Sequence, residues 1–184
     1  MVKEINKQIR TISHLLHPPL LDETGLASAL RWYVEGFSER SKIGVKLHIP
    51  SDFGRLPQEM ELSIFRMVQE CLTNIHRHAE SPTAGICITQ GDGRLIVEVE
   101  DVGKGIPLQK RLSLESLAQT GVGFRGMRER LRRLGGTLEI ESNGHGTRVT
   151  AILPVVHATA TASQEVAWDG LSSALPGAVQ RANG

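Results

Sequence analysis

The stretch Glu70-Cys-Leu-Thr-Asn74-Ile-His-Arg77-His78-Ala79 closes the longest helical pattern in the sequence, residues 56–79. Apolar residues recur along this pattern three and four positions apart, which predicts one buried helix face; they are Leu62, Phe65, Val68, Leu72, Ile75 and Ala79. At about 100° per residue, Glu70, Asn74, Arg77 and His78 share a separate polar stripe. Such a stripe is either a solvated helix flank or the edge of a site for a charged ligand.

Composition restricts the function classes. The 184-residue chain has 40% hydrophobic and 22% charged residues, which is ordinary for a globular protein with a full core. Its net charge is +1 and only 4% of its residues are aromatic, which argues against nucleic-acid binding. Cys71 and Cys87 lack metal-ligand spacing and are interpreted as reduced thiols of a cytoplasmic protein. No run reaches membrane-spanning length, so we expect no membrane contact by this segment.

Helical patterns flank the central one. Residues 3–16 carry an apolar stripe at Ile5, Ile9, Ile12 and Leu16, interpreted as the end of a longer helix. Pro18-Pro19 is expected to end it, because proline lacks an N–H donor. Thr24 is the expected cap of a helix from Leu26 to about Arg40. A last helix is expected over residues 124–134, ended by Gly135-Gly136.

Alternating apolar residues predict five strands, over residues 45–49, 83–89, 94–100, 137–141 and 147–153. Gln90-Gly-Asp-Gly93 and residues 142–146 are the turns that join two pairs of them into hairpins. Residues 108–120 have mixed polarity and are expected to form a mobile loop. The tail from His157 is rich in Ala, Ser, Thr and Gly, which predicts disorder, or at most a short docking helix around Trp168.

Two glycine motifs follow the central helix. Asp101-x-Gly103-x-Gly105 begins where a strand ends, where a carboxylate can accept from a purine amine and glycines admit a close ligand; it is also ordinary turn chemistry. Gly121-x-Gly123-x-x-Gly126 opens a helix, whose N-terminal N–H groups favour phosphate. Because this motif follows a loop and not a strand, a dinucleotide-binding unit fits poorly, and no P-loop is present.

Three chemistries are open to the polar helix stripe. The amide oxygen of Asn74 suits Mg²⁺, which takes oxygen ligands beside substrate phosphates. Glu70, one turn earlier, is placed to position or deprotonate a nucleophile. Arg77 and His78 are candidates for phosphate contacts.

In this order the motifs resemble the ATP-binding catalytic domain of bacterial two-component sensor histidine kinases. That domain belongs to the GHKL superfamily, shared with heat-shock chaperone ATPases, type II topoisomerases and mismatch-repair ATPases. Residues 70–79 resemble the N box, and residues 101–105 resemble the first glycine box. Residues 121–130 (GVGFRGMRER) resemble the second glycine box of the nitrate-sensor and desaturase-sensor subgroup, and residues 146–154 resemble the terminal strand. Residues 12–30 are similar to the end of that subgroup's dimerisation and phosphotransfer domain.

The resemblance implies an α/β fold, a two-layer sandwich of the Bergerat type. Its sheet would be mixed and mostly antiparallel, with three helices on one face and a helical segment before it. Residues 1–24 would be the end of the dimerisation helix and its linker. Residues 25–156 would be the ATP-binding domain, and residues 157–184 a disordered tail.

The resemblance also implies site residues. Glu70 would assist the attack of a histidine, and Asn74 with Glu70 would hold Mg²⁺. Asp101 would accept from the adenine amine, helped through water by Thr147. The residues expected to contact ATP are Asn74, Arg77, His78, Asp101, Gly103, Gly105, Ile106, Gly121, Val122, Gly123 and Thr147.

The implied activity is transfer of the ATP γ-phosphoryl group to a histidine of the dimerisation domain, for relay to a response-regulator receiver domain. The family's His-Asp acceptor motif is absent from this chain, so the chain resembles a catalytic fragment of a homodimeric kinase. One alternative is a nucleotide-binding interaction module without transfer, against which the intact Glu70 and Asn74 argue. Another is a serine kinase of the anti-sigma-factor type, against which the helical lead-in at residues 3–30 argues.

Overall fold

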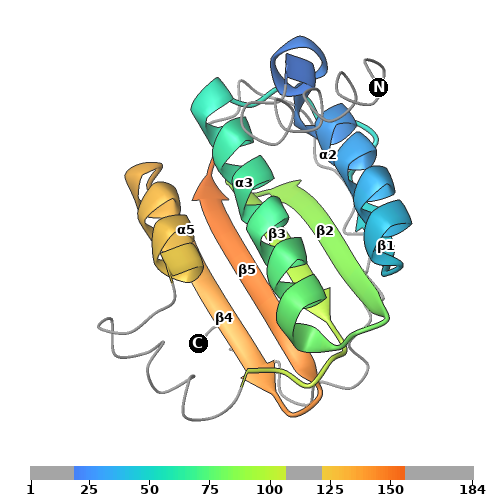
Figure 1. Cartoon of the computed structure of the whole chain (residues 1–184). Helices are drawn as coiled ribbons and strands as arrows, with labels where there is room; N and C mark the ends of the chain where they lie inside the picture. Colours follow the sequence, from blue (N-terminus) through green and yellow to red (C-terminus); the bar gives the residue numbers. More distant parts are fainter. Residues whose placement is uncertain (1–18, 107–121, 156–184) are drawn as a thin grey trace.

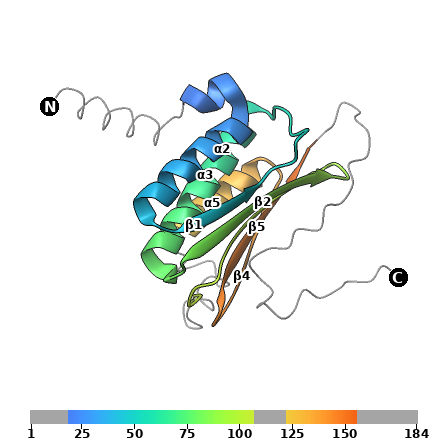
Figure 2. The ribbon, with the colours of Figure 1, turned by 90° about the vertical axis from the view of Figure 1, so that its right-hand side faces the viewer.

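The computed structural model describes residues 19–106 and 122–155, and these residues form a layer of helices against a five-stranded sheet (Figure 1). The strands are β1 (Gly44–His48), β2 (Thr83–Gly91), β3 (Arg94–Asp101), β4 (Thr137–Asn143) and β5 (Gly146–Pro154). The helices are α2 (Pro19–Ser41), α3 (Gln58–Asn74), the π-helical turn η1 (Ile75–Ala79) and α5 (Val122–Arg133). In Figure 2 the helices α2, α3 and α5 all lie on one side of the sheet. The predicted two-layer α/β sandwich is confirmed.

The sheet has the order β1-β2-β3-β5-β4, and β1 and β2 are its one parallel pair among the described strands. Although β5 comes last, it lies between β3 and β4, which pairs Asp101 at the end of β3 with Thr147 at the start of β5. The β2–β3 turn contains Asp92 with φ 49° and Gly93 with φ 71°, as a two-residue hairpin turn requires. The predicted mixed, mostly antiparallel sheet is therefore confirmed.

The core lies between the helices and the sheet. Four large side chains of α3 are fully buried in this core, namely Ile64, Phe65, Val68 and Leu72. On β3 the alternate side chains Leu95, Val97 and Val99 are at most 1% exposed and belong to the same core. Because the apolar face of α3 packs on the sheet, its polar residues are held at the margin of the helix.

The central helix differs from the prediction at both ends. It begins at Gln58 after Pro57, not at Leu56. From Ile75 to Ala79 the chain winds as a π-helical turn, in which hydrogen bonds run from i to i+5. Each of these residues therefore turns through less than the angle of an α-helix. The side chains after Asn74 lie elsewhere around the axis than a regular helix would place them.

The predicted helix from Leu26 is present as the second part of α2, and a short additional helical part precedes it. α2 starts at Pro19 and contains a break at Gly25, which has φ 83° and ψ 175°. Thr24 does not cap a helix, because its hydroxyl donates to the carbonyl oxygen of Leu20 at 2.8 Å. The prediction that Pro18-Pro19 ends a helix at residues 3–16 falls outside the described residues, and Pro19 itself opens α2, since proline is well tolerated in a first helical turn.

The other elements begin and end within two residues of their predicted positions. The predicted helix at residues 3–16, the loop at 108–120 and the tail from His157 lie outside the described residues. Among the residues that are described, no helix is both long enough and apolar enough to cross a membrane.

Candidate functional site

A small cavity lies where α3, η1, β3, β5 and α5 meet. Its volume is about 100 Å³, and it is lined by Cys71, Asn74, Ile75, His78, Ala79, Val99, Asp101, Gly105, Ile106, Phe124, Thr147 and Val149. The lining is mostly apolar, with Asn74, His78, Asp101 and Thr147 as its polar side chains. A largely apolar hollow with a few fixed polar groups is typical of a small-molecule site.

The carboxylate of Asp101 is the most strongly held polar group of this cavity. Asp101 is 5% exposed, and its Oδ1 accepts from the N–H of Gly103 at 2.8 Å. Burial raises the pKa of Asp101 above its ordinary value, while the N–H groups of Gly103 and Thr147 oppose the rise. An ionised carboxylate has about four acceptor positions, so two backbone donors leave capacity for a donor from a ligand.

A hydroxyl network holds Thr147, the neighbour of Asp101 on β5. The hydroxyl of Ser142 accepts from the N–H of Ile106 at 2.8 Å and donates to the carbonyl oxygen of Gly146 at 2.9 Å. It also lies 3.0 Å from the Thr147 hydroxyl. Because the single proton of Ser142 goes to Gly146, the Thr147 hydroxyl donates to Ser142 and keeps its own lone pairs for a water or a ligand. Ser142 carries no sign of this role in the sequence, where it looks like an ordinary turn residue.

The glycines of the first motif are in contact with backbone. A Cβ at residue 103 would collide with the carbonyl group of Ala79, and the adjacent Lys104 N–H donates to that carbonyl oxygen at 2.9 Å. Gly105, with φ 67°, approaches the carbonyl oxygen of Asn143 so closely that a Cβ there would also collide. Both glycines therefore join the end of β3 to its neighbours. Gly105 also lines the cavity, whereas Gly103 does not.

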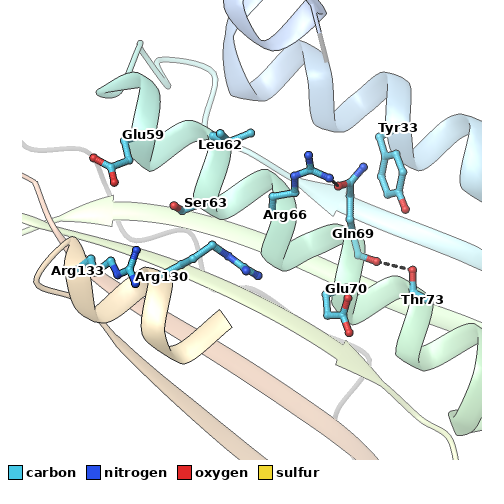
Figure 3. Close-up of a pocket in the computed structure, with 10 residues that line it drawn as sticks. All are labelled: Tyr33, Glu59, Leu62, Ser63, Arg66, Gln69, Glu70, Thr73, Arg130 and Arg133. Carbon is cyan, nitrogen blue, oxygen red and sulfur yellow. Dashed lines mark hydrogen bonds between the residues drawn. The ribbon is translucent and has the colours of Figure 1, made fainter. Parts of the chain in front are cut away.

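The structure divides the polar stripe of the central helix. Asn74 and His78 line the cavity. Glu70 instead lines a larger groove of about 670 Å³ over the outer face of α3, beside Arg130 of α5 (Figure 3). Arg77 is exposed and lines neither hollow. Glu70 and Asn74 both belong to the regular part of α3, so this division begins before the π-helical turn, which changes only the directions of the residues after Asn74.

Glu70 and Gly123 are in direct contact. A Cβ at residue 123 would collide with the Glu70 carboxylate, so the first turn of α5 approaches α3 where Glu70 lies. Gly121 lies outside the described residues, and Val122 is described only as the first residue of α5. The second glycine motif thus meets the acid of the central helix.

The donor set fits a magnesium ion better than a transition metal. Within residues 19–106 and 122–155, no group of three or more His, Cys, Asp or Glu side chains is placed to hold a metal. Mg²⁺ needs only one or two protein oxygens, because phosphate and water supply the rest. Asn74 and Glu70 offer two such oxygens, one helical turn apart.

Six lining residues were not identified as site residues from the sequence, namely Cys71, Ile75, Ala79, Val99, Phe124 and Val149. Their apolar spacing predicts burial but carries no sign of a ligand. Burial, with the charges of Glu70 and Asp101, raises the pKa of the Cys71 thiol. Cys71 is therefore a packing group and not a reactive thiol.

Comparison with known proteins gives consistent matches. Residues 59–157 match the family described as histidine kinase-, DNA gyrase B- and HSP90-like ATPase. The sensor histidine kinase MctS of Rhizobium johnstonii is 33% identical over 149 residues, which are 80% of this chain and 32% of that protein. The signal transduction histidine-protein kinase/phosphatase UhpB of Salmonella typhimurium is 36% identical over 148 residues, which are 79% of this chain and 28% of that protein. The chain thus spans about a third of the length of these curated relatives.

Solved structures resemble the fold. The histidine kinase domain of a blue-light activated histidine kinase from Erythrobacter litoralis has a TM-score of 0.60 and 27% identity, over 71% of this chain and 61% of that chain. The histidine kinase AdeS of Acinetobacter baumannii has a TM-score of 0.57 and 17% identity, over 85% of this chain and 84% of that chain. The second likeness supports the fold alone.

Proposed function

The chain is an ATP-binding domain of the histidine kinase-, DNA gyrase B- and HSP90-like ATPase family, and from this premise we propose that it acts as the catalytic part of a sensor histidine kinase. It would transfer the γ-phosphoryl group of ATP to a histidine on a partner dimerisation domain. The observation that carries the proposal is the buried Asp101 carboxylate in a mostly apolar cavity that Asn74 borders. The relatives named as sensor histidine kinases support it.

In this proposal the cavity binds the adenine ring. Asp101 accepts a hydrogen bond from the exocyclic amine, and Thr147 accepts through a water. Apolar side chains such as Val99 and Ile106 cover the faces of the ring. A guanine would place a carbonyl oxygen against the carboxylate, so the site favours adenine by leaving the wrong base with two facing acceptors.

The phosphates would lie between η1 and the first turn of α5. The positive end of α5 favours negative charge there, with Gly121, Val122 and Gly123 in contact and Arg77 and His78 near the outer oxygens. Asn74 and Glu70 would hold Mg²⁺ through their side-chain oxygens. When bound, Mg²⁺ offsets the charge that develops on the phosphate oxygens during transfer.

Glu70 would orient the attacking histidine nitrogen and hold its proton. It is half-buried and lines the open groove beside the cavity, so a side chain from another domain can reach it. From the histidine, the phosphoryl group would pass to an aspartate of a response-regulator receiver domain. The complete protein would then act as a homodimer, in the cytoplasm, with a dimerisation domain and a receiver domain as its partners.

The test is phosphoryl transfer between separate pieces. The chain is mixed with γ-labelled ATP, Mg²⁺ and a dimerisation fragment that carries the acceptor histidine. We expect acid-labile label on the fragment, lost with Glu70→Ala and retained with Glu59→Ala, a second carboxylate of the same groove. ATP binding without any transferred label would overturn the kinase proposal and favour an interaction module.

A further inference from the structure

A break divides α2 into a short first part, residues 19–24, and a long second part, residues 26–41 (Figure 1). Gly25, with φ 83° and ψ 175°, adopts a conformation that would strain any other residue. Leu21 and Leu26, one in each part, are 2% and 1% exposed. Both parts are therefore attached to the core, at an angle set between them.

The side chain of Arg55 lies against this break. A Cβ at residue 25 would lie 2.8 Å from the Arg55 Cδ. Arg55 Nη1 donates to the carbonyl oxygen of Asp22 at 3.3 Å, and Gln58 Nε2 donates to the carboxylate of Asp22 at 2.9 Å. Arg55, in the loop before α3, and Gln58, at the start of α3, thus both hold Asp22, which lies three positions before Gly25.

Glu61 fixes the orientation of Arg55. Its Oε1 and Oε2 accept from Arg55 Nε and Nη2 at 3.0 and 3.1 Å, and Glu61 is 0% exposed. Oε1 also accepts from the N–H of Leu56 at 3.1 Å. A buried carboxylate requires this degree of pairing, and the planar guanidinium is held in one direction by two parallel bonds.

An ion pair that served only the start of α3 would not need to reach α2. This pair reaches it twice, at the Asp22 carbonyl oxygen and at the surface of Gly25. We define the clamp as Asp22, Arg55, Gln58 and Glu61. None of these four residues lines the cavity assigned to adenine.

We propose that Arg55 is a positioning residue that, through the clamp, holds residues 19–24 at one angle to the ATP-binding domain. The direction of these residues determines where the preceding chain leads, and so how a histidine-bearing domain can approach Glu70. When the clamp is released, Gly25 permits other directions. This inference rests on the proposed function for its effect on transfer, but not for its effect on the angle.

The test measures the angle directly in the full chain. Spin labels are placed at Glu23→Cys and Glu39→Cys, two exposed positions on either side of the break, while the native Cys71 and Cys87 are buried. The clamp is removed by Arg55→Met with Glu61→Leu, which leaves no buried charge unpaired. The matched control is Arg132→Met with Glu129→Leu, an exposed ion pair at 3.1 Å on α5. If the double variant does not fold, Arg55→Lys replaces it in the test, because lysine keeps the positive charge but cannot make the two parallel hydrogen bonds of the guanidinium.

We expect a single narrow distance distribution for the unaltered clamp and for the control, and a broader or displaced one for the clamp variants. ATP affinity should be unchanged, while transfer to the histidine fragment falls about tenfold or more. An unchanged distance distribution in the clamp variants would overturn the positioning role. So would an ATP affinity that falls as far as transfer does, which would mean a general role in folding. If the unaltered chain transfers no phosphoryl group, the proposed function fails. The distance distributions still show whether the clamp holds the angle between the two parts of α2.

Discussion

Asp101 and Thr147 face each other across β3 and β5, and the backbone N–H of Thr147 donates to the Asp101 carboxylate. The N–H of Gly103 holds the same carboxylate at 2.8 Å. Sheet pairing therefore places and orients the group assigned to the adenine amine, with no contribution from a mobile side chain. Because the amide oxygen of asparagine can accept from the N–H of Gly103 as Oδ1 does, replacing Asp101 by asparagine removes the charge and keeps that contact.

Asp101→Asn should weaken ATP binding by about 10- to 100-fold, because a hydrogen bond to a charged group contributes roughly 1.5–3 kcal/mol. Titration calorimetry with ATP and with GTP measures the loss and the change in base preference. The matched control is Asp92→Asn at the exposed β2–β3 turn, where asparagine tolerates the left-handed backbone. Equal ATP affinity in the Asp101 variant would remove the carboxylate from the site.

Gly123→Ala should disrupt the junction of α3 and α5. Its methyl group would collide with the Glu70 carboxylate, so Glu70 or the first turn of α5 must move, and transfer should fall by about a hundredfold. The control is Gly126→Ala on the same helix, where the nearest atom is Arg130 Nη1 at 3.3 Å, the end of a flexible side chain. Alanine should stabilise that position by up to about 1 kcal/mol. Full transfer by the Gly123 variant would contradict the proposed role of Glu70.

The sandwich could be predicted because its signals are local. Alternation in β3 and apolar spacing in α3 are both properties of consecutive residues, and the burial of Val97 and Val68 follows from them. The Asp92-Gly93 turn is equally local. The cavity residues Asn74, His78 and Asp101 were found because each sits where one of these local patterns ends.

The missed features depend on contacts between distant segments. The π-helical turn at Ile75–Ala79 has no periodicity signal of its own. A side chain at residue 103 would collide with the carbonyl group of Ala79, and a side chain at residue 25 would collide with Arg55. A glycine in a sequence predicts an unusual backbone or a close neighbour, but it does not identify that neighbour.

Gln69→Met should stabilise the chain. Gln69 is 8% exposed, and its Nε2 has no partner among the described residues, while its Oε1 has only a long contact, 3.4 Å, from Arg66. Removing an unsatisfied buried donor should raise the free energy of unfolding by about 1–2 kcal/mol, measured by denaturant titration. The control is Gln58→Met, whose Nε2 is bonded to Asp22 and which should not stabilise the chain. A lower stability for the Gln69 variant would mean that the amide has a partner in solution.

The pH dependence of stability should also depend on Asp101. Burial raises its pKa in the folded protein above the ordinary value of 3.8, so the folded state binds the proton more tightly than the unfolded state. The free energy of unfolding must then fall as the pH rises from the ordinary pKa through the raised one. Asp101→Asn has no proton to lose, so the free energy of unfolding of the unaltered chain minus that of the variant should decrease across this window and level off above it. Denaturant titrations in steps of pH measure this difference, from which the raised pKa of Glu98, present in both proteins, cancels. A difference that increases with pH would mean that the N–H groups of Gly103 and Thr147 outweigh burial and lower the pKa of Asp101.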